Sequence, residues 1–414
     1  MTEMEKMGEK AKIAARTLAT AGAKKNEALE AIAAALQANA AKIIAANATD
    51  LENGKNNGLS AALLDRLMLN ESRIDGIAQG VREVEALPDP IGTVISGSTR
   101  PNGLKITKVR VPLGVIGIIF ESRPNVTADA AVLCLKSGNA VILRGGKEAI
   151  NSNICIAEIM RDAVESVGLD RNCIQLVQDT SRASSVELMN LTGYLDVLIP
   201  RGGKGLIRAV VDNAKVPVIE TGAGNCHTYV DESADIEMAA NIIYNAKTSR
   251  PSVCNAIETI LVHSAVAEKA LPAIKARLDE KNVELRGCER TREILGDCVV
   301  PAVESDWETE YGDYILAVRV VDSFDEAVAH IAKYSSGHSE CIVTSDYKSA
   351  RRFTEEVDAA AVYVNASTRF TDGGMFGNGA EIGISTQKLH ARGPMGLCEL
   401  TSMKFVIEGD GQVR

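Results

Sequence analysis

Residues 112–147 read PLGVIGIIFESRPNVTADAAVLCLKSGNAVILRGGK, and this stretch predicts the fold of the chain. Strands are expected at 115–120 and 140–144, with an apolar helix at 127–137 between them. A strand, a helix and a second strand in this order form a βαβ unit, whose two strands run parallel in one sheet. The stretch therefore predicts a parallel sheet covered by helices.

Strands and helices keep alternating toward the C-terminus. Further strands are expected at 174–177, 195–199 and 217–219, and helices at 152–167, 182–191 and 204–214. A second cycle has strands at 257–262, 283–286, 314–321, 340–344 and 361–364, and helices at 265–279, 324–334 and 347–356. A chain of 414 residues is too long for one compact core. Two α/β domains are therefore expected, each with helices on both faces of its sheet.

Two other kinds of segment flank this core. Residues 3–48 and 59–86 repeat apolar residues at helical spacing and predict a layer of amphipathic helices. Residues 93–111 contain β-rich segments around a Pro-Asn-Gly turn, which predicts a hairpin with Lys105, Lys108 and Arg110 on its outward face. Because a two-stranded ribbon is marginal alone, we expect it to pack on another subunit, together with a strand from 397–414.

The composition excludes several classes of protein. The net charge of −10 and the pI near 5.3 disfavour a nucleic-acid partner. Nine cysteines and five histidines show no metal-ligand spacing, so we expect no metal and a reducing compartment. The charged start lacks the apolar run of a signal peptide, and the apolar stretches are too short to cross a bilayer. A cytoplasmic protein without a membrane partner is expected.

Two glycine-rich turns follow predicted strands. One contains Arg144, Gly145, Gly146 and Lys147, and the other contains Arg201, Gly202, Gly203, Lys204 and Gly205. Turns at the carboxyl ends of parallel strands let backbone amides approach phosphate. Each alone is as often a simple tight turn. Two basic turns in an acidic protein favour a polyanionic cofactor such as a dinucleotide.

Cys254 differs from the other cysteines. It lies in NAKTSRPSVCNAIETILV, at the polar entrance to an apolar strand, whereas Cys134 and Cys155 lie on apolar helices as inert core. Lys247 and Arg250 precede it, and positive charge favours the thiolate. Cys254 is therefore the candidate nucleophile, although burial is the more common fate of a cysteine.

The strings FESRPNVT, LRGGKEA, DVLIPRGGKG, PVIETGAGN, SRPSVCNA, TRFTDGG and FGNGAEIGIST occur in this order along the chain. In order and spacing they resemble the aldehyde dehydrogenase superfamily, over nearly the whole sequence. Within it they are most similar to the branch that reduces L-glutamyl 5-phosphate. The resemblance implies an NADP-binding domain at 1–222, with the hairpin 93–111 as an arm. It also implies a catalytic domain at 223–396 and an oligomerisation strand at 397–414, with the site in the cleft between the domains.

The resemblance also implies roles for single residues. Cys254 would attack the acyl phosphate, and Asn125 and the backbone amide of Cys254 would donate to the oxyanion. Glu220 matches the residue that activates water in hydrolytic relatives, and here it is a candidate proton carrier. Glu310 falls where the family holds the nicotinamide ribose, or else it is a solvated loop carboxylate.

Charge complementarity suggests the remaining roles. Arg144 and Lys147 would pair with a 2′-phosphate, which predicts NADPH rather than NADH. Arg250 and Ser252 are candidates for the leaving phosphate, and Arg369 for the substrate α-carboxylate; each is otherwise a surface contact. The loop near the C-terminus contains Gly373, Gly374, Gly377 and Gly379. These glycines predict either a lid that closes over the substrate or simple turns.

The implied function is the NADPH-dependent reduction of L-glutamyl 5-phosphate to L-glutamate 5-semialdehyde in proline biosynthesis. A homo-oligomer is expected, and glutamate 5-kinase, which makes the labile substrate, is a plausible partner. Two alternatives stay open: a hydrolytic aldehyde dehydrogenase with Glu220 as base, and a binding scaffold without activity. Phosphate dependence of the oxidative reaction separates the reductase from the hydrolytic enzyme.

Overall fold

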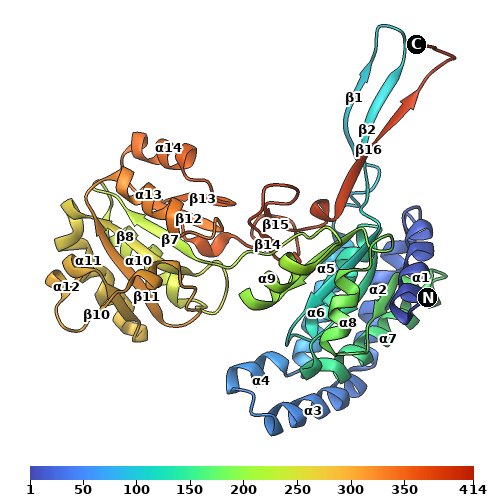
Figure 1. Ribbon diagram of the computed structural model, residues 1–414, viewed down its shortest axis with the longest axis horizontal. Helices are drawn as coiled ribbons and strands as arrows, with labels where there is room; N and C mark the ends of the chain where they lie inside the picture. Colours follow the sequence, from blue (N-terminus) through green and yellow to red (C-terminus); the bar gives the residue numbers. More distant parts are fainter. The chain divides into compact units, whose positions relative to one another are not determined.

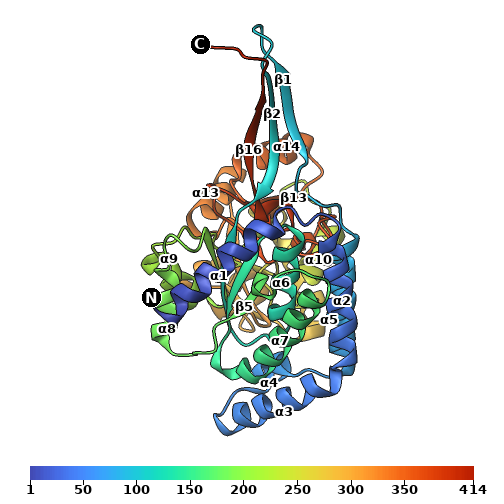
Figure 2. The same cartoon turned by 90° about the vertical axis from the view of Figure 1, so that its right-hand side faces the viewer.

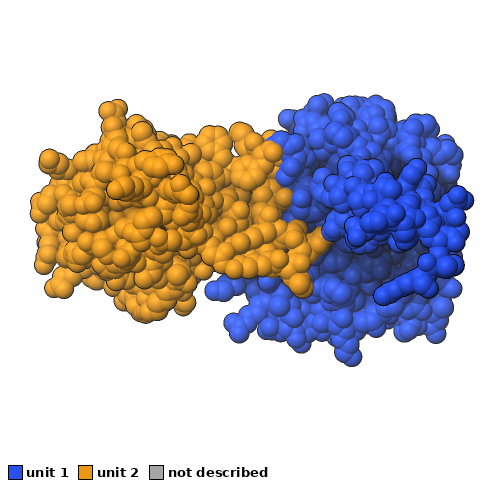
Figure 3. Space-filling view, turned by 90° about the horizontal axis from the view of Figure 1, so that it is seen from above, with its two compact units in different colours: residues 1–221, 377–383, 395–414 blue, residues 222–376, 384–394 orange. Residues whose placement is uncertain are grey.

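The computed structural model describes residues 1–414, apart from the side chain of Ala62, and divides them into two compact units (Figure 3). Unit 1 contains residues 1–221, 377–383 and 395–414, and unit 2 contains residues 222–376 and 384–394. The predicted boundaries assigned 377–383 to the second domain, but these residues fold with unit 1. Ile382 N donates to Met395 O at 3.0 Å and Met395 N donates to Gly383 O at 2.8 Å, and Met395 begins the C-terminal segment of unit 1.

The core of unit 1 is a four-stranded parallel sheet in the order β5-β4-β3-β6. Its strands are β3 (Val115–Phe120), β4 (Ala140–Arg144), β5 (Ile174–Leu176) and β6 (Val197–Arg201). The predicted strand at 217–219 is wrong, since only an isolated bridge joins Val218 to Leu198 there. Loops that follow β3, β4 and β6 share one edge of the sheet, as parallel strands require.

Helices cover both faces of this sheet, which makes the unit doubly wound (Figure 1). They are α1 (Glu3–Leu18), α2 (Lys24–Ala38), α3 (Ala40–Asn56), α4 (Ala61–Leu67), α5 (Glu71–Ala86), α6 (Asn125–Lys136), α7 (Ile150–Ser166), α8 (Arg182–Met189) and α9 (Lys204–Asn213). On one face, Met4 and Ala11 of α1 pack with Val115 and Leu188. Helix α2 packs against α5 and α7 in the other helical layer. The predicted doubly wound fold is confirmed.

A three-stranded antiparallel ribbon belongs to unit 1 and projects from its sheet (Figures 1 and 2). It contains β1 (Val94–Thr99), β2 (Lys105–Pro112) and β16 (Thr401–Glu408). The Pro-Asn-Gly turn closes the hairpin, with Gly103 at φ +86° and Arg100 N donating to Leu104 O at 2.8 Å. The predicted hairpin and the predicted C-terminal strand are both present, in one sheet.

Unit 2 contains a seven-stranded sheet, in the order β10-β9-β11-β8-β7-β12-β13, in which every pair is parallel. The strands are β7 (Cys226–Val230), β8 (Ile257–His263), β9 (Glu284–Gly287), β10 (Val300–Pro301), β11 (Ile315–Val321), β12 (Ser339–Val343) and β13 (Ala361–Val364). Its helices are α10 (Ile236–Thr248), α11 (Ser264–Leu278), α12 (Glu289–Leu295), α13 (Phe324–Tyr334) and α14 (Tyr347–Glu356). The sequence did not predict β7 or α10.

The remaining elements are short. They are the 3₁₀ helices Lys147–Ala149, Arg171–Cys173, Asp279–Lys281, Glu304–Glu308, Thr368–Phe370 and Cys398–Leu400, and the paired strands β14 (Ile384–Ser385) and β15 (Gly393–Pro394). No single described helix is long and apolar enough to cross a membrane, although the bent pair α2 and α3 reaches that length and composition together. Among the described residues no group of His, Cys, Asp and Glu could hold a metal ion.

Candidate active site

The loop after β3 is tied to the loop after β4 in unit 1. Ser122 has φ +43°, a left-handed conformation that is unusual for a residue other than glycine. Its backbone N and its Oγ both donate to Glu148 Oε1, at 2.7 and 2.6 Å. This contact stabilises the sharp turn that leads into α6, whose first residue is Asn125.

The first glycine turn is shaped mainly by packing. A Cβ at Gly145 would lie 2.2 Å from Asn153 Nδ2, so a larger residue would displace the Asn153 side chain. Arg144 donates through Nη2 to the carbonyls of Thr180 and Ser181, at 2.7 and 2.9 Å. Part of its guanidinium therefore joins two loops of the protein, whereas the neighbouring Lys147 is exposed to solvent.

The second glycine turn suits an anionic ligand better. Gly202, Gly203 and Lys204 are exposed at the N-terminus of α9, and nothing lies within 4 Å of a Cβ built on Gly203. The amide of Gly203 donates to Glu121 Oε2 at 3.0 Å, so a carboxylate already lies at this anion-binding amide. The turn therefore fits the phosphates of a dinucleotide, and Glu121 would compete with them.

Asn125, the candidate oxyanion donor, points its amide at a carboxylate that the sequence analysis overlooked. Asn125 Nδ2 donates to Asp129 Oδ2 at 2.8 Å. Burial raises the pKa of Asp129 to about 6, while the hydrogen bond from Asn125 and the charge of Arg201 act in the opposite direction. The spacing of four residues along one helix was the available signal for this pair.

In unit 2 the nucleophile candidate Cys254 is partly buried in a tight loop before β8. The backbone of Gly224 lies directly against it, since a Cβ at Gly224 would be 1.8 Å from Cys254 O. Cys226 Sγ donates to Cys254 O at 3.2 Å, and burial raises the pKa of Cys226 well above its usual value. The unreactive thiol of Cys226 and the close backbone of Gly224 therefore fix the Cys254 loop in place, and only glycine can occupy position 224.

Asn255, the residue after Cys254, joins this loop to the segment 368–371. Its Nδ2 donates to the carbonyls of Arg369 and Thr371, at 3.2 and 3.0 Å, and Thr368 Oγ1 donates to Asn255 O at 2.7 Å. The predicted α-carboxylate ligand Arg369 therefore belongs to the framework of the Cys254 loop.

Arg369 is the cation beside the nucleophile. Its guanidinium donates to Ser249 Oγ at 2.9 Å and also to Asn255 Oδ1, and it interacts electrostatically with Cys254. Burial and the nearby charge of Arg250 lower the pKa of Arg369. The predicted phosphate ligands Arg250 and Ser252 are exposed in the same segment.

The suggestion that Lys247 favours the Cys254 thiolate is not supported. Lys247 Nζ instead pairs with Glu258 Oε2 at 2.6 Å, and both side chains are fully buried. Burial lowers the pKa of Lys247 and raises the pKa of Glu258 to about 7. Glu258 Oε1 also accepts the amide of Gly312 at 3.1 Å, so the pair anchors the loop that carries the exposed Glu310.

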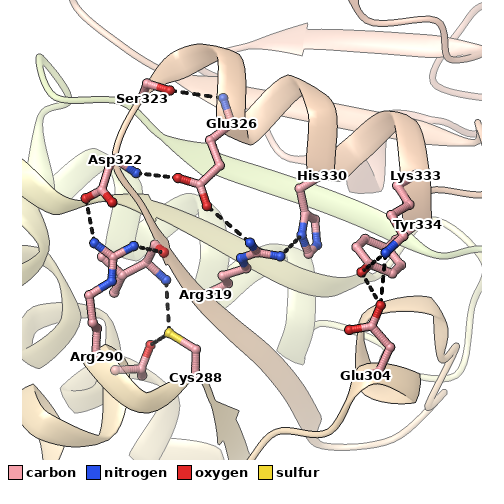
Figure 4. Close-up of polar contacts among 12 residues, drawn as sticks. Cys288, Arg290, Glu304, Arg319, Asp322, Ser323, Glu326, His330, Lys333 and Tyr334 are labelled. Carbon is pink, nitrogen blue, oxygen red and sulfur yellow. Dashed lines mark hydrogen bonds and ion pairs between the residues drawn. The ribbon is translucent and has the colours of Figure 1, made fainter.

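Helix α13 anchors the segment that leads to Gly224. Arg319 of β11 donates to His330 Nδ1 at 3.0 Å and to Glu326 Oε1 at 3.1 Å, which fixes α13 against the sheet (Figure 4). Tyr334, the last residue of α13, accepts Asn225 Nδ2 at its carbonyl at 2.8 Å. A polar network in the scaffold thus determines where the backbone beside Cys254 lies.

The predicted site residues fall into two sets. In unit 1, at or near the edge of the β3-β6 sheet, are Asn125, Arg144, Gly145, Gly146, Lys147, Gly202, Gly203, Lys204 and Glu220. In unit 2 are Arg250, Ser252, Cys254, Glu310 and Arg369. The first set contains two glycine-rich turns that follow strands and an amide donor, and the second contains a thiol and two guanidinium groups. Each unit therefore carries part of the chemistry that a dehydrogenase with a covalent cysteine intermediate would need.

The sequence model of the aldehyde dehydrogenase family matches residues 1–291 and 306–406. The chain belongs to this family, as its motifs predicted.

Within this family, relatives that match the whole chain are called gamma-glutamyl phosphate reductase. This chain is 61% identical over 415 residues to a gamma-glutamyl phosphate reductase of Carboxydothermus hydrogenoformans, with 100% of both chains covered. It is 59% identical over 413 residues to the reductase of the same name from Syntrophomonas wolfei, covering 100% of this chain and 98% of the relative. The crystal structure of gamma-glutamyl phosphate reductase from Thermotoga maritima superposes with a TM-score of 0.98 at 51% identity, covering 100% of both chains.

Proposed function

We propose that this chain reduces L-glutamyl 5-phosphate to L-glutamate 5-semialdehyde and phosphate with NADPH, in proline biosynthesis. The observation that carries the proposal is Cys254, which is partly accessible in a loop fixed by Gly224 and Asn255 and lies beside the guanidinium of Arg369. The substrate is inferred from the full-length relatives named gamma-glutamyl phosphate reductase. They favour this function over a hydrolytic aldehyde dehydrogenase.

The reaction begins with attack of the Cys254 thiolate on the acyl carbon. A C–S bond forms, the bond from carbon to the phosphate oxygen breaks, and phosphate leaves. Asn125 and the amide of Cys254 would donate to the oxyanion of the tetrahedral intermediate, where one lost donor costs about 3–4 kcal/mol. NADPH, when bound, supplies the hydride that reduces the thioester carbonyl. The resulting thiohemiacetal then releases the aldehyde and regenerates the thiolate.

We propose one change among the substrate ligands. Arg369 was expected at the α-carboxylate, but its guanidinium lies beside Cys254 and Arg250. We therefore assign Arg369, with Arg250 and Ser252, to the phosphate that leaves from the reacting carbon. Glu220 remains a candidate proton carrier, and Glu310 a candidate ligand of the nicotinamide ribose.

The preference for NADPH is assigned mainly to Lys147. This side chain is exposed after β4, where a cation would attract a 2′-phosphate. Arg144 donates to two carbonyl groups through Nη2, and its other guanidinium donors would contribute to binding the 2′-phosphate. The exposed turn at Gly202, Gly203 and Lys204 would bind the pyrophosphate.

The three-stranded ribbon is assigned to assembly of a homo-oligomer. Val94 and Phe405 are 60% and 63% exposed on a sheet with two open edges. Open edges and exposed apolar side chains favour pairing with another chain. The labile acyl phosphate makes glutamate 5-kinase a sensible partner, and a biosynthetic enzyme with free cysteines fits the cytoplasm. A single monomeric species in solution would contradict the oligomer.

The oxidative reaction tests the function. Glutamate 5-semialdehyde is supplied with NADP⁺, with and without inorganic phosphate, to the wild-type protein and to Cys254→Ala. The proposal expects phosphate-dependent NADPH formation that disappears in the variant. Steady turnover without phosphate would show a hydrolytic dehydrogenase instead.

A further inference from the structure

Asp129 lies one helical turn after Asn125 on α6, so both side chains share one face of that helix. Asn125 Nδ2 donates to Asp129 Oδ2 at 2.8 Å. An amide nitrogen has two hydrogens, and this contact uses only one of them. The second hydrogen remains for the substrate oxyanion, so Asp129 adjoins the position proposed for the reacting carbonyl.

The Asp129 carboxylate accepts its hydrogen bond from a neutral amide. Asn125 Nδ2 donates to its Oδ2, and the charge of Arg201 acts on the same carboxyl group. Burial raises the pKa of Asp129 to about 6, so the group is still ionised at neutral pH. A partly buried carboxylate in this state favours binding of a cation, because its loss of hydration is not compensated.

Arg201, at the end of β6, places the opposite charge nearby. Its charge acts on Asp129 electrostatically. Its guanidinium lies against the backbone of Gly383, where an added Cβ would be 2.2 Å from Arg201 Nη1. An ammonium and a carboxylate on one carbon, as in an α-amino acid, would find complementary charges at Asp129 and Arg201.

We propose that Asp129 binds the α-ammonium group of the glutamyl substrate and determines the preference for an amino-bearing acyl chain. The inference rests on the proposed function, which places the C5 carbonyl at Asn125. With two hydrogen bonds of about 2.9 Å from one amide, the oxyanion and Asp129 Oδ2 are about 5 Å apart. Four bonds of about 1.5 Å join C5 to the amino nitrogen, so the ammonium reaches Asp129 in an extended or slightly bent chain.

The test compares two aldehydes that differ only in the amino group. Oxidation of L-glutamate 5-semialdehyde and of glutarate semialdehyde is measured with NADP⁺ and phosphate, for wild type, Asp129→Asn and Asp129→Ser. Removing one partner of a buried charge pair typically costs a factor of about 30 or more. We expect both variants to lose about that factor in kcat/KM for the amino substrate, and less than about threefold for glutarate semialdehyde.

The ratio of the two kcat/KM values does not depend on the fraction of folded enzyme, so a poorly folding variant still gives an answer. An equal loss on both substrates would show that Asp129 only orients Asn125, and it would overturn the proposal, as would no loss on either. Asn125→Ala is the matched control and should lower both substrates equally. If wild type oxidises the amino substrate without phosphate, or Cys254→Ala keeps activity, the proposed function fails whatever Asp129 does.

Discussion

Gly224→Ala tests whether the backbone beside Cys254 determines catalysis. A Cβ at residue 224 would lie 1.8 Å from Cys254 O and 2.3 Å from Cys254 Cα. Ordinary contacts of this kind are about 3.5 Å, so one of the two backbones must move by more than about 1 Å. A displacement of 1 Å at a reacting group costs about 100-fold in rate. We therefore expect kcat for phosphate-dependent oxidation to fall at least about 100-fold.

The assay needs a second readout and a matched control. NADPH binding, followed by fluorescence titration, should stay within about twofold of wild type, because the predicted phosphate-binding turns belong to unit 1. Gly76→Ala is the control, since nothing lies within 4 Å of a Cβ at this exposed helical position. A Gly224→Ala protein with kcat within threefold of wild type would refute the reasoning.

Four further predictions concern single side chains. Glu121→Gln should tighten NADPH binding by roughly threefold to tenfold, because it removes a carboxylate from the amide of Gly203; weaker binding would contradict the competition. Lys147→Glu should reverse the preference for NADPH over NADH in kcat/KM, and a retained preference would count against the assignment. Asp50→Ala should lower the free energy of unfolding in urea by about 3 kcal/mol, since Asp50 accepts four hydrogen bonds at the start of α7, and a change below about 1 kcal/mol would be inconsistent with that role. Burial lowers the pKa of His330 to about 2. Below pH 6.5 the unfolded state therefore binds one proton more than the folded state, and the free energy of unfolding decreases as the pH decreases. His330→Gln should remove a slope of about 1.4 kcal/mol per pH unit between pH 6 and 5, and equal slopes in the two proteins would refute this.

The sequence predicted the parts of the fold that local pattern controls. The apolar strands β3, β4 and β8 and their helices were placed within a few residues. Strand β7 was missed because its sequence, CHTYV, is short and partly polar. It is buried through a tertiary contact, in which His227 Nδ1 lies 3.1 Å from Glu340 Oε2.

The candidate site shows the same division. Cys254 and the glycine turns were found from sequence, because their chemistry depends on residue type and local spacing. Lys247 was misread, since only the fold brings Glu258 within 2.6 Å of it. Residues 377–383 were expected with 223–396, and they group with unit 1 through hydrogen bonds to Met395, the first residue of its C-terminal segment.

The most direct test of the central claim is a rapid-mixing measurement with glutamate 5-semialdehyde and NADP⁺ in the absence of phosphate. A thioester on Cys254 predicts a burst of one NADPH per active site, which then stops and resumes when phosphate is added, and it predicts no burst from Cys254→Ala. Linear NADPH formation without phosphate, or a burst from the variant, would contradict the thioester mechanism.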